Sequence, residues 1–263
     1  MHFIFRIANI DILFKTEDIE SVFNKFCVKS QKSFLEFIDL SFKCQYESYQ
    51  IYELNNRIDR IMFYQGDILL AIEDWTKCFR INVGVMSTST DSLHIQFYAN
   101  AVKHHMIQVH SSLVEYNGYG VMFLGPSGIG KTTQAELWNQ YLDALIINGD
   151  IVYVEDKGEE FIGWGTPWHG SSPYCENTSV PVKALIVLKQ GSENSLRRLE
   201  GLEMVSSVGA QVFYPDWVEQ GVELALETLD HVLKGIPVYE LVNRADEESV
   251  MMVKQAVFGN EED

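Results

Sequence analysis

The sequence predicts a mixed α/β protein in which a strand-rich N-terminal region, residues 1–105, precedes a domain at residues 106–260. Two observations support this prediction. Short runs of β-branched and aromatic residues fill the first hundred positions, and no catalytic motif accompanies them. Further along, the stretch G-P-S-G-I-G-K-T-T at Gly125–Thr133 follows the apolar run Val121–Leu124 and leads into helix-forming residues up to Tyr141. We therefore expect the second domain to be organised around a strand, a glycine-rich loop and a helix.

The N-terminal region is expected to form a largely antiparallel sheet. A glycine in Gln65-Gly66-Asp67 marks a hairpin turn between two apolar runs, and Thr16–Phe26 is expected to be a short helix. The expected strands are His2–Ile7, Ile10–Phe14, Ser33–Phe42, Ile58–Tyr64, Ile68–Ile72 and Phe79–Val85. The aromatic residues expected in the core of this region are Phe34, Phe37, Phe42 and Trp75.

A helix is predicted over Ser92–Met106, at the end of the N-terminal region, because this stretch has apolar residues at helical spacing. An Asn-Gly turn then joins Ile107–Val114 and Val121–Leu124 into a predicted hairpin. The later strands are expected at Ala144–Ile147, Ile151–Val154, Phe161–Trp164, Val182–Leu188 and Ile236–Val242, and the later helices at Arg197–Ser207, Gly221–Lys234 and Glu247–Phe258.

The residues Gly165–Thr178 contain few helix or strand formers, which predicts a long loop. Loops of this length inside a compact domain are often functional. We expect this loop to lie on the side of the candidate active site where an acceptor substrate would bind. Trp168 and His169 are candidates to flank a substrate, and Trp168 is an equally good candidate for a packing anchor.

The composition excludes several classes of protein. The net charge is −17, which opposes nucleic-acid binding because that depends on neutralising phosphates with Lys and Arg. No run of about 18 apolar residues is present, so no membrane span is expected. The N-terminus shows no secretory signal, and the four cysteines are widely spaced. We therefore expect a cytoplasmic protein with reduced thiols.

The motif G-x4-G-K-[ST] is typical of a phosphate-binding P-loop. Its glycines allow backbone N–H groups to turn toward phosphate oxygens, and the following helix N-terminus adds partial positive charge. Lys131 would reach the β- and γ-phosphates of ATP, and the Thr132 hydroxyl would hold Mg²⁺. The simpler alternative is a glycine-rich turn at a strand–helix junction. The predicted nucleotide-binding residues are Gly125, Ser127, Gly128, Ile129, Gly130, Lys131, Thr132 and Thr133.

Asp150 and His110 are the candidate catalytic side chains beside Lys131. Asp150 follows the expected strand after the loop's helix, so its carboxylate could hold Mg²⁺ or accept a proton from an attacking hydroxyl. The alternative for Asp150 is a turn residue at a strand end. His110 lies in the strand that is expected to pair with Val121–Leu124, from which it could contact a transferred phosphoryl group or orient Asp150. A lone histidine in a strand is more often structural.

The segment from Val109 to Thr132 resembles the catalytic domain of the bacterial HPr kinase/phosphorylase family. The resemblance rests on a histidine in a strand, a Gly-x-Gly turn, a second strand and a P-loop at the same spacing. It implies a fold related to phosphoenolpyruvate carboxykinase, a catalytic role for Asp150, a supporting role for His110 and a homo-oligomer.

Three features depart from that family. Thr132 replaces the usual Ser, the family's Glu-x-Arg-Gly stretch is replaced near Gly163–Trp168, and its C-terminal Pro-Gly-Arg-Asn stretch is not visible. The departures argue against the reverse phosphorylase reaction and against HPr as substrate. The chain looks closer to stand-alone HPr-kinase-like proteins of peptide-modification pathways, such as lasso peptide kinases.

These expectations combine into an ATP- and Mg²⁺-dependent kinase that transfers the γ-phosphate to a hydroxyl, Ser in a peptide or protein. Two alternatives stay open at the level of the sequence. One is a kinase of a small molecule such as free serine. The other is a nucleotide-binding regulatory protein that transfers no phosphate.

Overall fold

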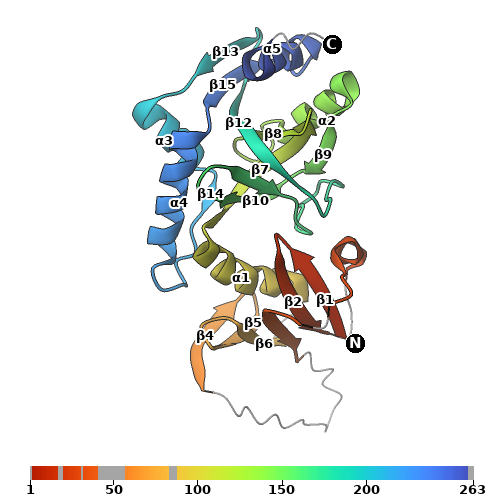
Figure 1. Cartoon of the computed structure of the whole chain (residues 1–263), viewed down its shortest axis with the longest axis vertical. Helices are drawn as coiled ribbons and strands as arrows, with labels where there is room; N and C mark the ends of the chain where they lie inside the picture. The colour runs from red at the N-terminus through yellow and green to blue at the C-terminus, as the bar shows by residue number, and fades with distance from the viewer. Residues whose placement is uncertain (1, 17–19, 31, 41–56, 83–87, 260–263) are drawn as a thin grey trace. The chain divides into compact units, whose positions relative to one another are not determined.

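The computed structural model describes residues 2–16, 20–30, 32–40, 57–82 and 88–259, and it divides the chain into two compact units, Met1–Ala101 and Val102–Asp263 (Figure 1). Both units contain helices and sheets, so the protein has a mixed α/β fold that is rich in strands. Within the described ranges, no helix has the length and apolar character needed to cross a membrane.

The described residues of the first unit form a six-stranded sheet in the order β1-β2-β3-β6-β5-β4. The pairs β2–β3 and β3–β6 are parallel, so the expectation of an antiparallel sheet is only partly correct. A long connection that includes η1 links β2 to β3, as a parallel pair requires. The elements are β1 (His2–Ile7), β2 (Ile10–Lys15), η1 (Ser21–Phe26), β3 (Leu35–Asp39), β4 (Ile58–Tyr64), β5 (Asp67–Ile72), β6 (Lys77–Asn82) and α1 (Ser89–Ala101).

Several local expectations in this unit need correction. Within the described part of Thr16–Phe26, the expected short helix is a 3-10 helix confined to Ser21–Phe26. The strand expected from Phe79 is shifted to Lys77–Asn82, and the remainder of that expectation lies outside the described residues, as does Phe42. Phe37 and Trp75 are buried as predicted, but Phe34 precedes β3 and is 56% exposed.

Residues 102–259 of the second unit form a nine-stranded sheet, and five of its strands form a closed ring. The order β11-β10-β7-β8-β12 is completed by pairing between β11 and β12, and β15 and β13 extend the sheet beyond β12. The strands are β7 (Met106–Tyr116), β8 (Tyr119–Leu124), β9 (Leu145–Asn148), β10 (Ile151–Asp156), β11 (Phe161–Trp164), β12 (Ser179–Gln190), β13 (Ser195–Arg198), β14 (Val212–Phe213) and β15 (Val238–Asn243). The helices are η2 (Val102–His104), α2 (Lys131–Leu142), α3 (Gly201–Gly209), α4 (Gly221–Gly235) and α5 (Glu247–Phe258).

The predicted hairpin is confirmed, because β7 and β8 pair antiparallel from Ser111↔Leu124 to Tyr116↔Tyr119. Strand β7 is long enough to have two successive partners: β9 pairs with its second half and β10 with its first half. Asp150 lies in the short break between β9 and β10, where its carbonyl accepts a hydrogen bond of 2.9 Å from the Ser111 N–H. The break therefore lies beside His110 and the end of β8.

Two helix predictions, one at the end of the first unit and one within the second, extend too far. The helix expected to reach Met106 ends at Ala101, because η2 and the left-handed residue His105 intervene before β7. The helix expected from Arg197 begins at Gly201, because Ser195–Arg198 pairs with β15 as strand β13. The pairing of a short strand such as β13 depends on a partner that lies far along the chain, and local periodicity does not reveal that partner.

The core beneath the glycine-rich segment is aromatic and aliphatic. Trp138 of α2 is fully buried, and its ring packs edge-on against Phe123 of β8 and against Tyr116 of β7. Phe258 of α5 contacts the rings of Trp138 and Tyr116. Burial of these side chains holds α2 against the hairpin, so the start of α2 has a fixed position relative to the end of β8.

Candidate functional site

The segment Gly125–Gly130 connects the end of β8 directly to the start of α2, as the sequence predicts. Gly128 and Gly130 adopt φ values of +78° and +113°, which L-residues rarely adopt, and a Cβ at either position would meet open space. The N–H groups in the first turn of an α-helix have no partner inside the helix. The backbone N–H groups of this turn can therefore bind an anion.

Lys131 is the first residue of α2 and is 6% exposed. Its Nζ donates a hydrogen bond of 3.0 Å to the carbonyl oxygen of Gly125 and lies 2.9 Å from Nε2 of His110. Burial lowers the pKa of Lys131, and the negative charge of Asp150 opposes that effect. The lysine thus lies folded back over its own loop.

His110 places its Nε2 atom between a lysine and a carboxylate. Nε2 lies 2.9 Å from Nζ of Lys131 and 3.0 Å from Oδ1 of Asp150. Nζ and Oδ1 therefore lie no farther apart than about 6 Å, the sum of those two distances. One ring nitrogen carries either a hydrogen or a lone pair, so Nε2 cannot donate to Asp150 and accept from Lys131 at once.

The carboxylate of Asp150 is held in its charged form. The hydrogen bond with His110 lowers the pKa of Asp150, and the positive charges of Lys131 and His169 act in the same direction, while burial opposes them. An ionised carboxylate is the form that can bind a cation or accept a proton. The structure therefore brings Lys131, His110 and Asp150 together in one cluster at the end of β8.

The other predicted site residues lie around this cluster. The Thr132 hydroxyl faces the carbonyl of Gly149 at 3.4 Å. Ser127 and Thr133 are exposed, and Ile129 packs its side chain against Gly125. In the part of the chain that the structure describes, no three His, Cys, Asp or Glu side chains gather as a metal site. Any magnesium ion here would need phosphate or water oxygens in addition to protein ligands.

The loop Gly165–Thr178 contains no helix or regular strand, as predicted. Trp168 is only 7% exposed, so it serves as a packing anchor and does not flank an open site. His169 is partly exposed, and its Nδ1 donates to the carbonyl of Ser172 within a tight turn. The next residue along the loop, Gly170, lies against the Asp150 carboxylate.

Two residues that contact the Asp150 region were missed by the sequence analysis. Asn148 is fully buried and binds backbone atoms on both sides of the site, and Gly170 lies against the Asp150 carboxylate. The sequence Asn148-Gly149 after an apolar run signals a turn, and nothing in it indicates a hydrogen-bonding centre. The contact of Gly170 with Asp150 joins residues twenty positions apart, which local patterns do not reveal.

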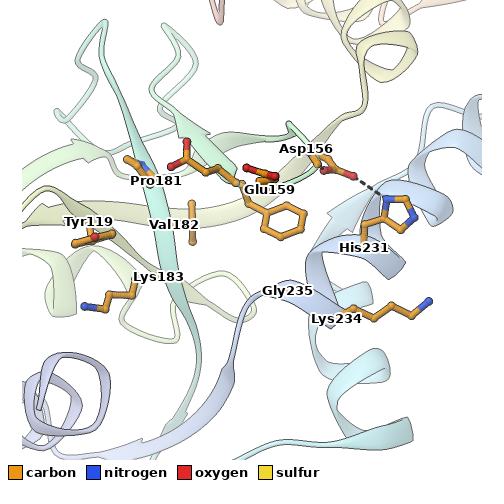
Figure 2. Close-up of a pocket in the computed structure, with 12 residues that line it drawn as sticks. Tyr119, Asp156, Glu159, Pro181, Val182, Lys183, His231, Lys234 and Gly235 are labelled. Atoms are coloured by element: carbon orange, nitrogen blue, oxygen red, sulfur yellow. Dashed lines mark hydrogen bonds and ion pairs between the residues drawn. The ribbon is translucent and has the colours of Figure 1, made fainter.

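A separate cavity of about 700 Å³ lies at the other end of the same strands (Figure 2). Its lining includes Tyr119, the first residue of β8, and Asp156, the last residue of β10, whose carboxylate pairs with His231 at 2.8 Å. None of the predicted site residues lines it. Charges of both signs surround the cavity, so its chemistry favours no single class of ligand.

Comparisons with known proteins do not show a family for this chain. No protein-family model matches the sequence, and no curated protein matches it. Among solved structures, the HPr(Ser) kinase/phosphatase from Coxiella burnetii is similar, with a TM-score of 0.33 and 12% identity over 57% of this chain and 93% of that one. A likeness at this level leaves the function to be argued from the site itself.

Proposed function

We propose that the protein is an ATP- and Mg²⁺-dependent phosphotransferase that moves the γ-phosphate to a hydroxyl, the side chain of Ser in a peptide or protein. The observation that carries this proposal is the cluster of Lys131, His110 and Asp150 at the mouth of the loop Gly125–Gly130. A loop that binds phosphate and a carboxylate that activates an alcohol must lie within a few ångströms of each other in any such enzyme.

The nucleotide would bind with its phosphates on the N–H groups of the loop and of the first turn of α2. Lys131 would leave the carbonyl of Gly125 and bind the β- and γ-phosphates. Its departure frees His110 from the conflict at Nε2, because the ring can then donate to Asp150 alone. Nucleotide binding would thereby fix the orientation of the carboxylate.

The protein oxygens beside the loop Gly125–Gly130 suit a magnesium ion. Mg²⁺ is usually held by one or two protein oxygens together with phosphate oxygens and water. The Thr132 hydroxyl and the Asp150 carboxylate supply protein oxygens of this kind, and the hydroxyl already faces the segment Gly149–Asp150. When bound, the ion would neutralise charge on the phosphates.

Asp150 would accept the proton of the acceptor hydroxyl as the phosphoryl group is transferred. The bond between the γ-phosphorus and the bridging oxygen of ATP breaks, a bond to the acceptor oxygen forms, and ADP leaves. Lys131 and the loop N–H groups would stabilise the charge that develops on the phosphates. Both the acceptor and the nucleotide must then reach the exposed side of the cluster.

The test is the variant Asp150→Asn, which keeps the shape of the side chain and removes its charge. We expect phosphate transfer to fall by roughly 10²- to 10⁴-fold, the usual contribution of a general base, while ATP still binds. The assay would measure ADP production and phosphorylated product with serine-containing peptides and with free serine, beside ATP binding by calorimetry. A variant with the wild-type transfer rate would contradict the assignment of Asp150.

The same assay separates the alternatives. Transfer to free serine but not to peptides would indicate a small-molecule kinase. Binding of ATP without transfer to any hydroxyl, by the wild-type protein, would indicate a regulatory nucleotide-binding protein.

A further inference from the structure

The loop Gly165–Thr178 is tied to the segment that carries Asp150 at several backbone positions. The N–H of Glu176 donates to the carbonyl of Ile147 at 2.8 Å, and the N–H of Gly149 donates to the carbonyl of Tyr174 at 3.2 Å. The two ends of the loop are joined by a hydrogen bond of 2.9 Å from the Gly165 N–H to the Thr178 carbonyl. The loop therefore follows any movement of the end of β9.

Asn148 connects the loop to the backbone of Asp150. Its Nδ2 donates to the carbonyls of Thr166 and Trp168 at 3.0 and 3.2 Å. Its Oδ1 accepts from the N–H groups of Asp150 and Ile151 at 2.8 and 3.0 Å. Only a side-chain amide offers donors and an acceptor at this length, so neither Asp nor a small apolar residue can make all of these contacts.

Gly170 lies directly against the carboxylate of Asp150. It adopts φ +57°, and a Cβ built on it would lie 2.4 Å from Oδ2 and 2.9 Å from Cγ of Asp150. Atoms this close cannot coexist, so a side chain at position 170 would move either the carboxylate or the loop. The carboxylate thus occupies space that exists only because residue 170 is glycine.

The two oxygens of Asp150 have different surroundings. Oδ1 contacts His110 at 3.0 Å, whereas no described residue hydrogen-bonds to Oδ2, which faces the bare backbone of Gly170. The side chain of Asp150 retains 29% of its accessible surface. Oδ2 is therefore the oxygen that is left for an incoming hydroxyl or a metal ion.

We propose that Asn148 and Gly170 are positioning residues for Asp150: Asn148 fixes the backbone on which the carboxylate stands, and Gly170 leaves Oδ2 open beside the loop. This inference rests on the proposed function, since it assigns the two residues a part in phosphate transfer. It gives the loop Gly165–Thr178 a specific task, which is to hold the carboxylate with Oδ1 toward His110 and Oδ2 toward the acceptor.

The experiment compares Gly170→Ala with Gly201→Ala. Gly201 has almost the same backbone angle, φ +56°, is also exposed, and has nothing within 4 Å of the position that a Cβ would take. Both substitutions therefore introduce a similar backbone strain, but only Gly170→Ala collides with Asp150. We expect Gly170→Ala to lower kcat for transfer by roughly tenfold to a hundredfold, the effect of misplacing a reacting group by about 1 Å. ATP affinity should stay unchanged, and Gly201→Ala should change neither quantity.

Asn148→Asp gives a second measurement at the other positioning residue. Aspartate has the same shape and keeps the acceptor, but it cannot donate to Thr166 and Trp168. We expect kcat of the folded protein to fall more than ATP affinity does. A purely structural role would instead lower the melting temperature and leave kcat per folded molecule unchanged.

The outcomes distinguish this inference from the proposed function. Equal kcat values for Gly170→Ala and Gly201→Ala, in a wild-type protein that transfers phosphate, would overturn the positioning role alone. If the wild-type protein transfers no phosphate, the proposed function fails, and the crystal structure of Gly170→Ala decides whether the geometric part of the inference holds. A carboxylate displaced from His110 would support it, and an unmoved carboxylate would overturn it.

Discussion

Each of the two units contains a cluster of charged side chains, and the clusters differ in how fully their charges are satisfied. In the N-terminal unit, the guanidinium of Arg80 donates from Nε to Asp67 at 2.6 Å and from Nη1 to Asp39 at 3.2 Å. Asn82 and Ser92 also donate to the Asp67 carboxylate, at 2.7 and 2.6 Å. All of these donors come from the chain itself, and the side chains of Arg80 and Asp67 retain 4% and 0% of their accessible surface.

The cluster in the C-terminal unit is open. The side chains of His110 and Asp150 retain 22% and 29% of their accessible surface, and Lys131 directs its hydrogen bonds to the loop beside it. A buried carboxylate with a complete set of donors contributes to folding, whereas a partly exposed carboxylate with one open oxygen can still bind something else. The comparison sets a closed cluster, which serves folding, beside an open cluster, on which the proposed reaction depends.

The largest effect on stability is expected at Arg80. Replacing Arg80 with Met would leave two buried carboxylates without their counter-charge, and breaking a buried ion pair in this way usually costs about 3–5 kcal/mol. The free energy of unfolding, measured with urea on the whole protein, should fall by about that amount. The matched control is Arg6→Met, which breaks an exposed pair with Asp11 and should change stability little. Equal losses in the two variants would contradict the distinction between the clusters.

The next effect is expected at His110, and it should appear in activity instead of stability. His110→Ala removes the hydrogen bond that orients the Asp150 carboxylate, and we expect a roughly tenfold to hundredfold loss in the rate of phosphate transfer, the effect of misplacing a reacting group by about 1 Å. Because the histidine is partly exposed, the free energy of unfolding should change by less than about 1 kcal/mol.

The control for His110 is His231→Ala. His231 pairs with Asp156 at 2.8 Å, a distance similar to the 3.0 Å between His110 and Asp150, but it lies beside the cavity at the far end of β10. Its removal should leave phosphate transfer unchanged. A loss of transfer in both variants would show that proximity to a carboxylate, and not position beside the loop, explains the effect of His110.

Sequence reasoning reached the parts of this protein that depend on neighbours along the chain. The hairpin of β7 and β8, the glycine segment and the start of α2 near Lys131 all follow from local turn residues and apolar runs. The buried ion cluster around Arg80 was missed, because Asp39, Asp67 and Arg80 look like ordinary surface charges until β3, β5 and β6 are placed side by side.

The candidate site shows the same division. Lys131, Asp150 and His110 could all be proposed from the sequence, but the 3.0 Å contact of Asp150 with His110 depends on the pairing of β10 with β7, which joins distant segments. The roles of Asn148 and Gly170 depend on a loop that returns to its own strand, for which the sequence offers only an absence of helix and strand formers. The last two residues of β13, Arg197 and Arg198, were predicted as helix, because the pairing of β13 with β15 outweighs local preference.

The smallest effect is expected from an exposed charge that belongs to neither cluster. Asp246 is the N-cap of α5, where its carboxylate accepts from the N–H of Ser249 at 3.1 Å. The hydrogen bond from Asn194 lowers the pKa of Asp246, and the Ser249 N–H and the charge of Arg244 act in the same direction. The folded state therefore binds this proton less readily than the unfolded state, whose pKa is near 3.8. The stabilisation is present above that value and is lost as the pH falls through the lower pKa of the folded state.

Asp246→Asn isolates this contribution, because asparagine also serves well as an N-cap but does not titrate. The difference in free energy of unfolding between the wild type and Asp246→Asn should be largest near neutral pH and should shrink as the pH falls below 3.8 and through the lower pKa of the folded state. Urea unfolding of both proteins across that range measures it. A difference that stayed constant with pH would mean that the charge of Asp246 contributes nothing to α5 beyond its hydrogen bond. The physical reason would be that water replaces the ion-pair partner of an exposed charge at little cost in free energy.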